Sequence, residues 1–208
     1  MEIKNILSTL KNRKRSILGY EELKKSAVLL PLIEIQGETH ILFEVRSMDL
    51  RNQPGDICFP GGRIDKNDLS PEDCAIRETT EELGISNKLI KDIIPLDYIV
   101  SDFGRIIYPY VGKITKPEEF SLNKSEVEEV FSVPLSYFLN TTPDSYKVHF
   151  QVIPEENFPF ELIVGGKDYN WQTRHINELF YTYEDRVIWG LTAKILKHFL
   201  ELLNKGEK

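Results

Sequence analysis

The chain has 208 residues, of which 41% are hydrophobic and 28% are charged, and its formal net charge at pH 7 is −7. This length suits one medium domain (1–208), and the acidic balance argues against nucleic-acid binding, which requires a basic surface. No stretch reaches the roughly 18 apolar residues of a membrane span and no secretory hydrophobic region is present, so we expect a cytoplasmic protein with no membrane partner.

The first part of the chain is predicted to form a helical extension followed by the beginning of a sheet. Residues 1–25 mix basic and apolar positions, a pattern typical of short amphipathic helices. Apolar runs then predict strands at 27–35 and 40–45, and a short strand at 57–59 after an intervening loop.

A helix with clear boundaries is predicted after a pair of glycines. Ser70 is a favourable N-cap and Pro71 suits the first helical position. Gly84 stands where a left-handed residue ends many helices. The helix is therefore expected between the serine and this glycine.

Two groups of side chains are expected on opposite sides of this helix. Helical periodicity places Ile76, Thr80 and Leu83 on one stripe. Glu78 and Glu82 fall roughly opposite that stripe. We therefore expect the helix to pack through one face and to present carboxylates on the other.

The second half of the chain is predicted to complete a sheet and to close with a helix. Strands are expected at 89–94, 98–100, 106–114 and 127–133, a short helix at 135–139, a hairpin from 147–153 and 160–164, and a closing helix at 183–203. Strands flanked by helices at both ends of the chain indicate an α/β fold with a mixed β-sheet between helices.

The carboxylates of the predicted helix indicate a divalent metal. Glu78, Glu81 and Glu82 project within about a third of the helix circumference, where like charges repel one another. Mg²⁺ uses one or two protein carboxylates together with water and substrate phosphate oxygens, and so suits this arrangement. Arg77 precedes Glu81 by four positions and could hold its carboxylate by a hydrogen bond. The alternative is an ordinary solvated acidic helix face.

The segment around this helix resembles a known family motif. Residues 59–85 read FPGGRIDKNDLSPEDCAIRETTEELGI and resemble the Nudix box, G-x5-E-x7-R-E-U-x-E-E-x-G-U with U aliphatic. The matching residues are Arg77, Glu78, Glu81, Glu82, Gly84 and Ile85. The sequence departs from the motif in three ways: Arg77 comes one residue late, Asp68 replaces a glutamate, and Thr79 occupies an aliphatic position.

A second motif narrows the resemblance to one subfamily. Residues 42–62 read LFEVRSMDLRNQPGDICFPGG and resemble the LLTxR(S/A)x3Rx3Gx3FPGG signature of coenzyme A pyrophosphatases. Phe43 and Glu44 depart from its leading residues. That subfamily also tends to have the longer spacing and the aspartate seen at Asp68. The resemblance extends over roughly 27–196.

The resemblance implies a Nudix-type α/β/α sandwich that uses Mg²⁺ or Mn²⁺. By position in the motif, Glu78 and Glu82 are expected to bind the metal, and Glu81 to act as a catalytic or orienting group. Nudix folds often recruit a downstream acid, for which Glu126 is the catalytic candidate. The alternative for Glu126 is an exposed glutamate at a strand edge.

Residues near the glycine pair are the candidates for substrate binding. Arg46 and Arg51 could bind phosphate through forked hydrogen bonds, or they could be buried partners of the acidic helix. Gly61 and Gly62 are expected to allow a close approach of the backbone beside the metal.

The resemblance implies hydrolysis of the diphosphate of coenzyme A or its thioesters to 3′,5′-ADP and 4′-phosphopantetheine or its acylated form. One alternative is a Nudix diphosphatase for another nucleoside diphosphate derivative, such as ADP-ribose or NADH. An alternative of a different class is a non-catalytic nucleotide-binding module. The expected partner is thus a small molecule, and a homodimer is an assembly that such a protein could form.

Overall fold

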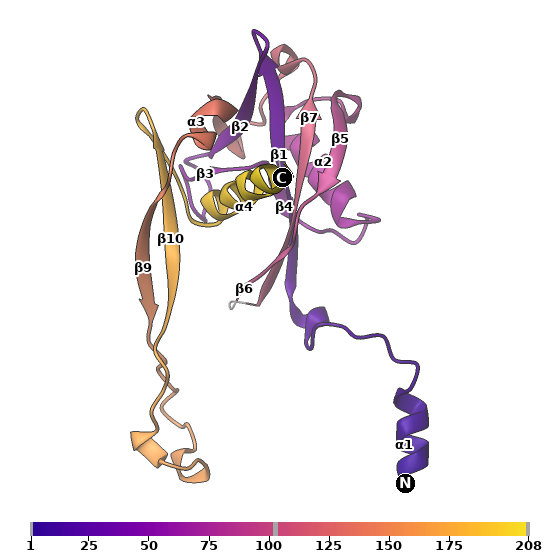
Figure 1. Cartoon of the computed structure of the whole chain (residues 1–208), viewed down its shortest axis with the longest axis vertical. Coiled ribbons are helices and arrows are strands. Elements are labelled where there is room, and N and C mark those ends of the chain that lie inside the picture. Colours follow the sequence, from indigo (N-terminus) through magenta and orange to yellow (C-terminus); the bar gives the residue numbers. More distant parts are fainter. Residues whose placement is uncertain (1, 102–103, 207–208) are drawn as a thin grey trace.

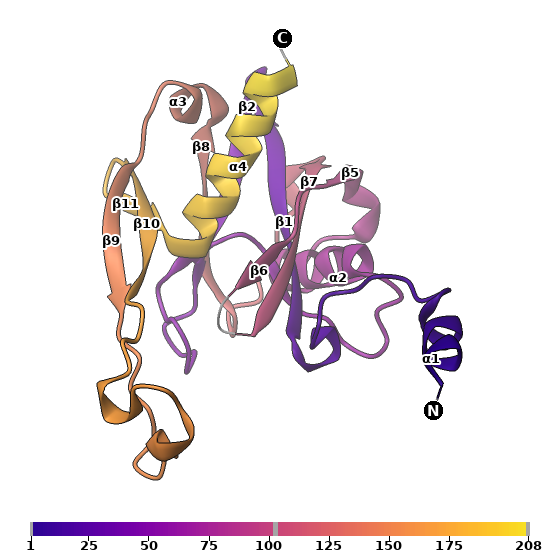
Figure 2. The ribbon, with the colours of Figure 1, turned by 60° about the horizontal axis from the view of Figure 1, so that its bottom comes forward.

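The body of the protein is a mixed sheet with a helix on each face (Figures 1 and 2). The computed structural model describes residues 2–101 and 104–206. The strands of this sheet are β1 (Lys24–Ile35), β2 (Glu38–Arg46), β3 (Ile57–Cys58), β4 (Gly61–Arg63), β5 (Ile90–Pro95), β6 (Ile99–Ser101), β7 (Arg105–Ile114) and β8 (Val127–Pro134). The helices are α1 (Ile3–Leu10), α2 (Pro71–Leu83), α3 (Leu135–Leu139) and α4 (Gly190–Gly206).

The strand pairing confirms the predicted mixed sheet. Its central order is β3-β2-β1-β7-β5, while β4 pairs with β1, β6 with β7, and β8 with β2. The long strands β1 and β7 run parallel, whereas β1 and β2 run antiparallel. Helix α2 contacts β1, β4 and β7, and α4 lies across the other face. The α/β/α sandwich is therefore confirmed.

Strand alternation divides the hydrophobic core into two layers. In β1, Ala27 and Leu29 join the cluster under α2, while Leu30 joins the cluster under α4. In β2, Leu42 faces α2 and Phe43 faces α4. Because successive side chains of a strand point to opposite faces, both central strands are buried on both sides.

Helix α2 has the predicted boundaries but a different buried face. The Ser70 hydroxyl accepts a hydrogen bond from the Asp73 amide at 3.1 Å, and Gly84 ends the helix with φ of 64°. The expected stripe was wrong in part: Leu83 is buried, but Thr80 is only half-buried, and Glu82 lies on the packed side. The buried residues of the helix are Cys74, Ala75, Thr79, Glu82 and Leu83.

The threonine in the aliphatic motif position is accommodated without an unpaired hydroxyl. Thr79 is fully buried, and its Oγ1 donates to the Ala75 carbonyl oxygen at 2.7 Å. This bond to the preceding helical turn satisfies the polar atom, so Thr79 packs where an aliphatic residue would otherwise stand.

A separate three-stranded sheet forms an arm that extends from the body (Figure 1). Its strands are β9 (Asp144–Phe150), β10 (Arg174–Tyr183) and β11 (Arg186–Trp189). The predicted strand at 160–164 was wrong, because Phe160–Leu162 is a 3-10 turn and β9 pairs with β10 instead.

The closing helix is shorter than predicted. The expected helix at 183–203 begins only at Gly190, because residues 180–183 pair with 186–189 in a hairpin. Phe180 and Trp189 stack across this hairpin with ring centroids 5.8 Å apart, an aromatic pair that stabilises the strands.

The N-terminal extension contains little regular structure. Helix α1 covers Ile3–Leu10 and buries none of its residues, and a 3-10 turn follows at Tyr20–Glu22. Position 1 of the predicted extension lies outside the described residues, and residues 24–25 already belong to β1. Figure 1 shows α1 standing away from the body.

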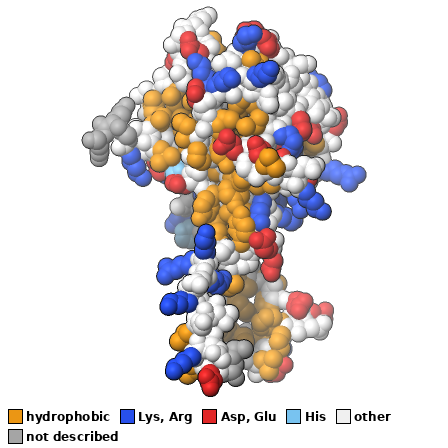
Figure 3. Space-filling view, turned by 90° about the vertical axis from the view of Figure 1, so that its right-hand side faces the viewer, with side chains coloured by type: hydrophobic (Ala, Val, Ile, Leu, Met, Phe, Trp, Pro, Cys, Tyr) orange, Lys and Arg blue, Asp and Glu red, His pale blue; other side chains and the backbone are white. Residues whose placement is uncertain are grey.

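The surface carries charges of both signs. On the face in Figure 3, acidic and basic side chains are interspersed, and hydrophobic side chains gather across the middle. Within residues 2–101 and 104–206, no helix is both long and apolar enough to cross a membrane.

Gly84 ends α2 and packs against the loop that precedes β8, so its substitution should be costly. A Cβ at this position would overlap the Ser121 carbonyl, and φ is positive. We expect Gly84→Ala to lower the free energy of unfolding by roughly 2–4 kcal/mol, measured by urea denaturation. Gly37→Ala is the matched control, since φ is +84° there with open space around it, and should cost roughly 1 kcal/mol. Equal losses for the two variants would contradict the steric argument.

Candidate functional site

Glu82 lies on the packed side of α2, against the glycine strand β4. Its side chain is 5% exposed, and its Oε2 accepts a hydrogen bond from the Gly61 amide at 2.8 Å. A Cβ on Gly61 would collide with the Ala27 carbonyl oxygen and the Val28 backbone of β1. Glycine at this position therefore lets β4 lie close enough to β1 and α2 for its amide to reach the carboxylate.

Glu78 lies over the second glycine of the pair. A Cβ on Gly62 would overlap the Glu78 carboxylate, which shows that the carboxylate packs directly against the bare backbone. The Glu78 side chain is 16% exposed, so one side of it still faces solvent. The structure thus brings Glu78, Glu82, Gly61 and Gly62 together, as the sequence predicted.

Arg77 connects the helix to the loop that follows β4. Its Nε and Nη2 each donate to an oxygen of Asp68 at 2.9 Å, a forked pair. Its Nη1 lies 2.9 Å from Glu78 Oε1 and donates to Glu81 Oε2 at 3.2 Å. The expected contact between Arg77 and Glu81 is confirmed. Asp68 and the longer spacing therefore have a structural reason, because the loop folds back to place Asp68 under the guanidinium.

Glu44 is a buried carboxylate that was not among the site residues predicted from the sequence. It is 1% exposed, and its Oε1 accepts a hydrogen bond from Cys58 Sγ at 3.2 Å. Glu44 and Cys58 are register partners in the β2–β3 ladder. The available signal was the alternation of β2: Leu42 faces α2, so Glu44, two residues on, faces the same side.

Burial and mutual repulsion disfavour the charged forms of these glutamates. Burial, and then the Glu44 carboxylate, raise the pKa of Glu82 to about 9. Burial also raises the pKa of Glu44 to about 7, with contributions from Glu126 and Glu78. The pKa of Glu78 is raised chiefly by burial. A divalent cation bound among these oxygens would reverse the local field and favour all of the carboxylate forms.

Glu126 lies near the same carboxylates. It is half-buried just before β8, and its carbonyl oxygen accepts from the Ser47 amide at 2.8 Å. Its loop is tied to α2, because the Asn123 amide donates to the Glu82 carbonyl oxygen at 2.9 Å. Repulsion from Glu126 makes a smaller contribution to the raised pKa values of Glu44, Glu78 and Glu82.

The two candidate phosphate-binding arginines occupy different environments. Arg46 is half-buried at the end of β2, and its Nε is buried without a hydrogen-bond partner. Arg51 is exposed in the loop between β2 and β3. Among the described residues, the ion pairs of the helix carboxylates Glu78 and Glu81 come from Arg77 and not from these arginines.

The donor set suits a hard divalent cation, although it is not assembled into a closed cage. The described parts of the chain contain no group of three or more His, Cys, Asp or Glu residues already arranged to hold a metal ion. One oxygen of Glu44 is nonetheless buried without a partner, and all the candidate donors are carboxylates, which Mg²⁺ and Mn²⁺ prefer.

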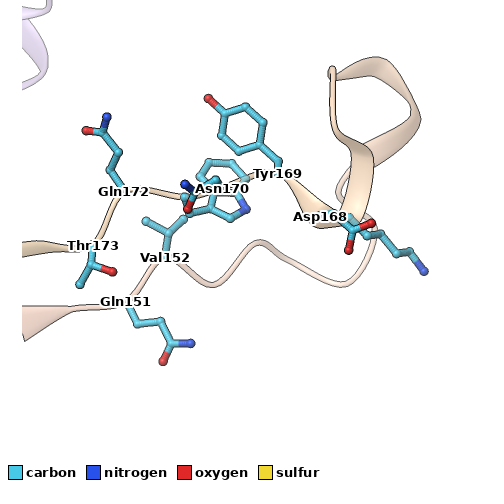
Figure 4. A pocket seen from close by; sticks show the side chains of 9 residues that line it. Gln151, Val152, Asp168, Tyr169, Asn170, Gln172 and Thr173 are labelled. Carbon is cyan, nitrogen blue, oxygen red and sulfur yellow. The ribbon is translucent and has the colours of Figure 1, made fainter.

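A cavity at the end of the arm is a second place where a ligand could bind. A hollow of about 480 Å³ at the end of the arm is lined by Val152, Tyr169 and Trp171, with Asp168 at its edge (Figure 4). A single acidic residue there offers no comparable metal site. The glutamates around the glycine pair are therefore the candidate site.

Comparison with known proteins places this chain in one family. The NUDIX domain model matches residues 23–154. The peroxisomal coenzyme A diphosphatase NUDT7 of Mus musculus is 36% identical over 82% of this chain and 66% of that protein. The peroxisomal coenzyme A diphosphatase ndx-8 of Caenorhabditis elegans is 39% identical over 59% of this chain and 54% of that protein.

A solved structure shares the fold. The MutT/nudix family protein from Enterococcus faecalis aligns with a TM-score of 0.52 and 17% identity, over 98% of this chain and 70% of that chain. The chain spans about two thirds of the mouse protein and about half of the Caenorhabditis elegans protein.

Asp68 should stabilise the fold in a pH-dependent way. Hydrogen bonds from Arg77 lower the pKa of Asp68 to about 2, below its unfolded value. The stabilisation is therefore complete above roughly pH 4 and is lost as the pH falls through about 2. We expect Asp68→Asn to cost roughly 1–3 kcal/mol at pH 7 and much less near pH 2, measured by urea denaturation. The exposed Asp168→Asn is the control, and a loss for Asp68→Asn that does not change with pH would contradict this account.

Proposed function

This chain belongs to the Nudix family of hydrolases, and we propose that its substrate is the diphosphate of coenzyme A or of its thioesters. The products would be 3′,5′-ADP and 4′-phosphopantetheine or its acylated form. Two features support this substrate: the signature over residues 42–62, and relatives from two animals whose names are coenzyme A diphosphatases. The observation that best supports metal-dependent hydrolysis is the group of buried glutamates around Gly61 and Gly62.

Glu78 and Glu82 would hold Mg²⁺ or Mn²⁺ on the packed face of α2. The Gly61 amide fixes one oxygen of Glu82, and Arg77 holds Glu78 at its Oε1, so both carboxylates are oriented before an ion arrives. When bound, the ion supplies neutralisation of phosphate charge and makes an attacking water more acidic.

Two further carboxylates could accept the proton of the attacking water. Glu81 is 53% exposed and is oriented by Arg77, so it stands at the solvent side of the metal glutamates. Glu126 is half-buried in the loop before β8, and this loop is hydrogen-bonded to the last turn of α2. A general base must reach that water, and these two glutamates are less buried than Glu82, which the Gly61 amide holds.

The arginines and glycines would position the diphosphate. Arg46 has a buried N–H without a partner, and Arg51 is exposed in the adjoining loop, so both guanidinium groups are available to phosphate oxygens. Gly61 and Gly62 leave no side chain between β4 and the carboxylates, which allows a substrate to approach the backbone.

The aromatic residues give little support for a stacked adenine in the body. Tyr110 is 8% exposed in the core under α2, and the Tyr108 hydroxyl shares a hydrogen bond with Tyr20. Trp189 is 40% exposed but stacks on Phe180.

The cytoplasmic location of this chain stays a prediction. The mouse relative is named as a peroxisomal protein.

A hydrolysis panel tests the substrate. The chain should be incubated with Mg²⁺ or Mn²⁺ and coenzyme A, acetyl-coenzyme A, ADP-ribose or NADH, with products separated by chromatography. We expect the largest kcat/KM for coenzyme A or its thioester. A larger kcat/KM for ADP-ribose would overturn the substrate but keep the hydrolase, and no turnover of any compound would favour a binding module.

A single substitution tests the metal glutamate. We expect Glu82→Gln to lower kcat/KM by about a hundredfold or more at saturating Mg²⁺, because the neutral amide replaces a charged oxygen ligand. Glu72→Gln, in the first turn of the same helix, is the control and should retain activity. Unchanged turnover for Glu82→Gln would show that Glu82 does not bind the metal.

A further inference from the structure

Glu44 is withdrawn from water more completely than the metal glutamates of the motif. It is 1% exposed, compared with 5% for Glu82 and 16% for the Glu78 side chain. Only one of its oxygens is satisfied within the described chain: Oε1 accepts from Cys58 Sγ at 3.2 Å, while Oε2 is buried with no partner. A buried carboxylate oxygen without a donor is costly, so its presence requires an explanation.

The strand geometry directs Glu44 toward the glutamates of α2. Ile41 and Phe43 belong to the core layer under α4, and Leu42 belongs to the layer under α2. By alternation Glu44 lies on the α2 side, where its neighbour on β8, Val130, also packs. The Glu44 carboxylate is near enough to Glu82 to be the largest charged influence on it.

The surroundings of Glu44 lack the cation that a structural carboxylate would need. Glu126 and Glu78 raise the pKa of Glu44, whereas the positive charge of Arg46 lowers it. Arg46 does not satisfy it, because Arg46 Nε is itself buried without a partner. A buried acceptor on Glu44 and a buried donor on Arg46, two residues apart in β2, therefore remain unpaired, and they are suited to a metal ion and to a phosphate respectively.

We propose that Glu44 is a further oxygen ligand of the divalent cation held by Glu78 and Glu82, contributed from the sheet side of the site. This inference rests on the proposed function for the existence of that cation. It also gives a role to a departure from the family signature, because Glu44 stands where that signature has a threonine. In this chain the cation would thus be bound between the helix and β2, and not by the helix alone.

Metal affinity distinguishes this role from a purely structural one. We expect Glu44→Gln to weaken Mn²⁺ binding by at least about tenfold, measured by isothermal titration or by the free Mn²⁺ electron paramagnetic resonance signal. The melting temperature without metal should be unchanged or higher, because one repelling carboxylate is gone and the amide oxygen can still accept from Cys58. Glu128→Gln removes one exposed charge from the neighbouring strand β8 and should leave Mn²⁺ affinity unchanged.

The outcomes separate this inference from the proposed function. An unchanged Mn²⁺ affinity with a lower melting temperature in Glu44→Gln would assign Glu44 a structural role and overturn the inference. Glu44→Thr, which restores the residue of the signature, provides a second variant if Glu44→Gln does not fold, and it should show the same loss of affinity. The unmodified chain could bind Mn²⁺ more tightly than Glu44→Gln and yet hydrolyse no diphosphate. In that case the proposed function fails, but Glu44 remains a metal ligand.

Discussion

The concentration of carboxylates between α2 and the sheet is the constraint on which the rest of the site depends. Glu44 and Glu82 are almost fully withdrawn from water, Glu78 lies against the bare backbone of Gly62, and Glu44 and Glu78 both raise the pKa of Glu82. Such an arrangement is unfavourable in an isolated chain, because buried like charges are poorly solvated and repel one another. Binding a divalent cation would offset both effects, so the free energy stored in this arrangement becomes affinity for the metal.

The surrounding structure holds these carboxylates in place through backbone contacts and one arginine. The Gly61 amide fixes Glu82, and Arg77 contacts Glu78, Glu81 and Asp68 together. Asp68 neutralises part of the guanidinium charge and fixes its plane, so that Arg77 orients the helix glutamates without occupying the metal position. The arginine of the motif is therefore a positioning residue within α2, and the proposed binding of phosphate is left to Arg46 and Arg51.

The fold connects the site to both core layers. β1 and β2 are buried on both faces, and their alternating residues reach α2 on one side and α4 on the other. The C-terminal end of α2 is tied to the loop before β8 by bonds from Ser121 and Asn123 to carbonyl oxygens of the helix. The same loop carries Glu126, so the last turn of the helix and this glutamate are placed by one set of contacts.

Local chemistry in the sequence determined α2 and its carboxylates. The cap at Ser70, the left-handed glycine at Gly84 and the spacing of Glu78 and Glu82 depend on neighbours within a few residues, and the structure has all of them. The strands of the main sheet could also be predicted, because a long apolar run favours a buried strand before its pairing partners are known. Strand β11 was predicted as the start of the closing helix at 183–203, because the short apolar run at 187–189 fits either period until its partner strand β10 is known.

Only the tertiary structure decided which glutamates of α2 are buried. The sequence predicted that Glu82 lies on a carboxylate face opposite the packed stripe, whereas Glu82 is buried because the glycine strand β4 passes close enough to donate to it. Glu44 is a similar case: it lies far from the helix along the chain, and pairing of β2 with β3 and β8 brings it beside the helix. A sequence records the spacing of charges along one element, but desolvation depends on what packs against that element. The burial of these glutamates, on which the proposed metal site rests, is therefore a property of the assembled sheet and helix.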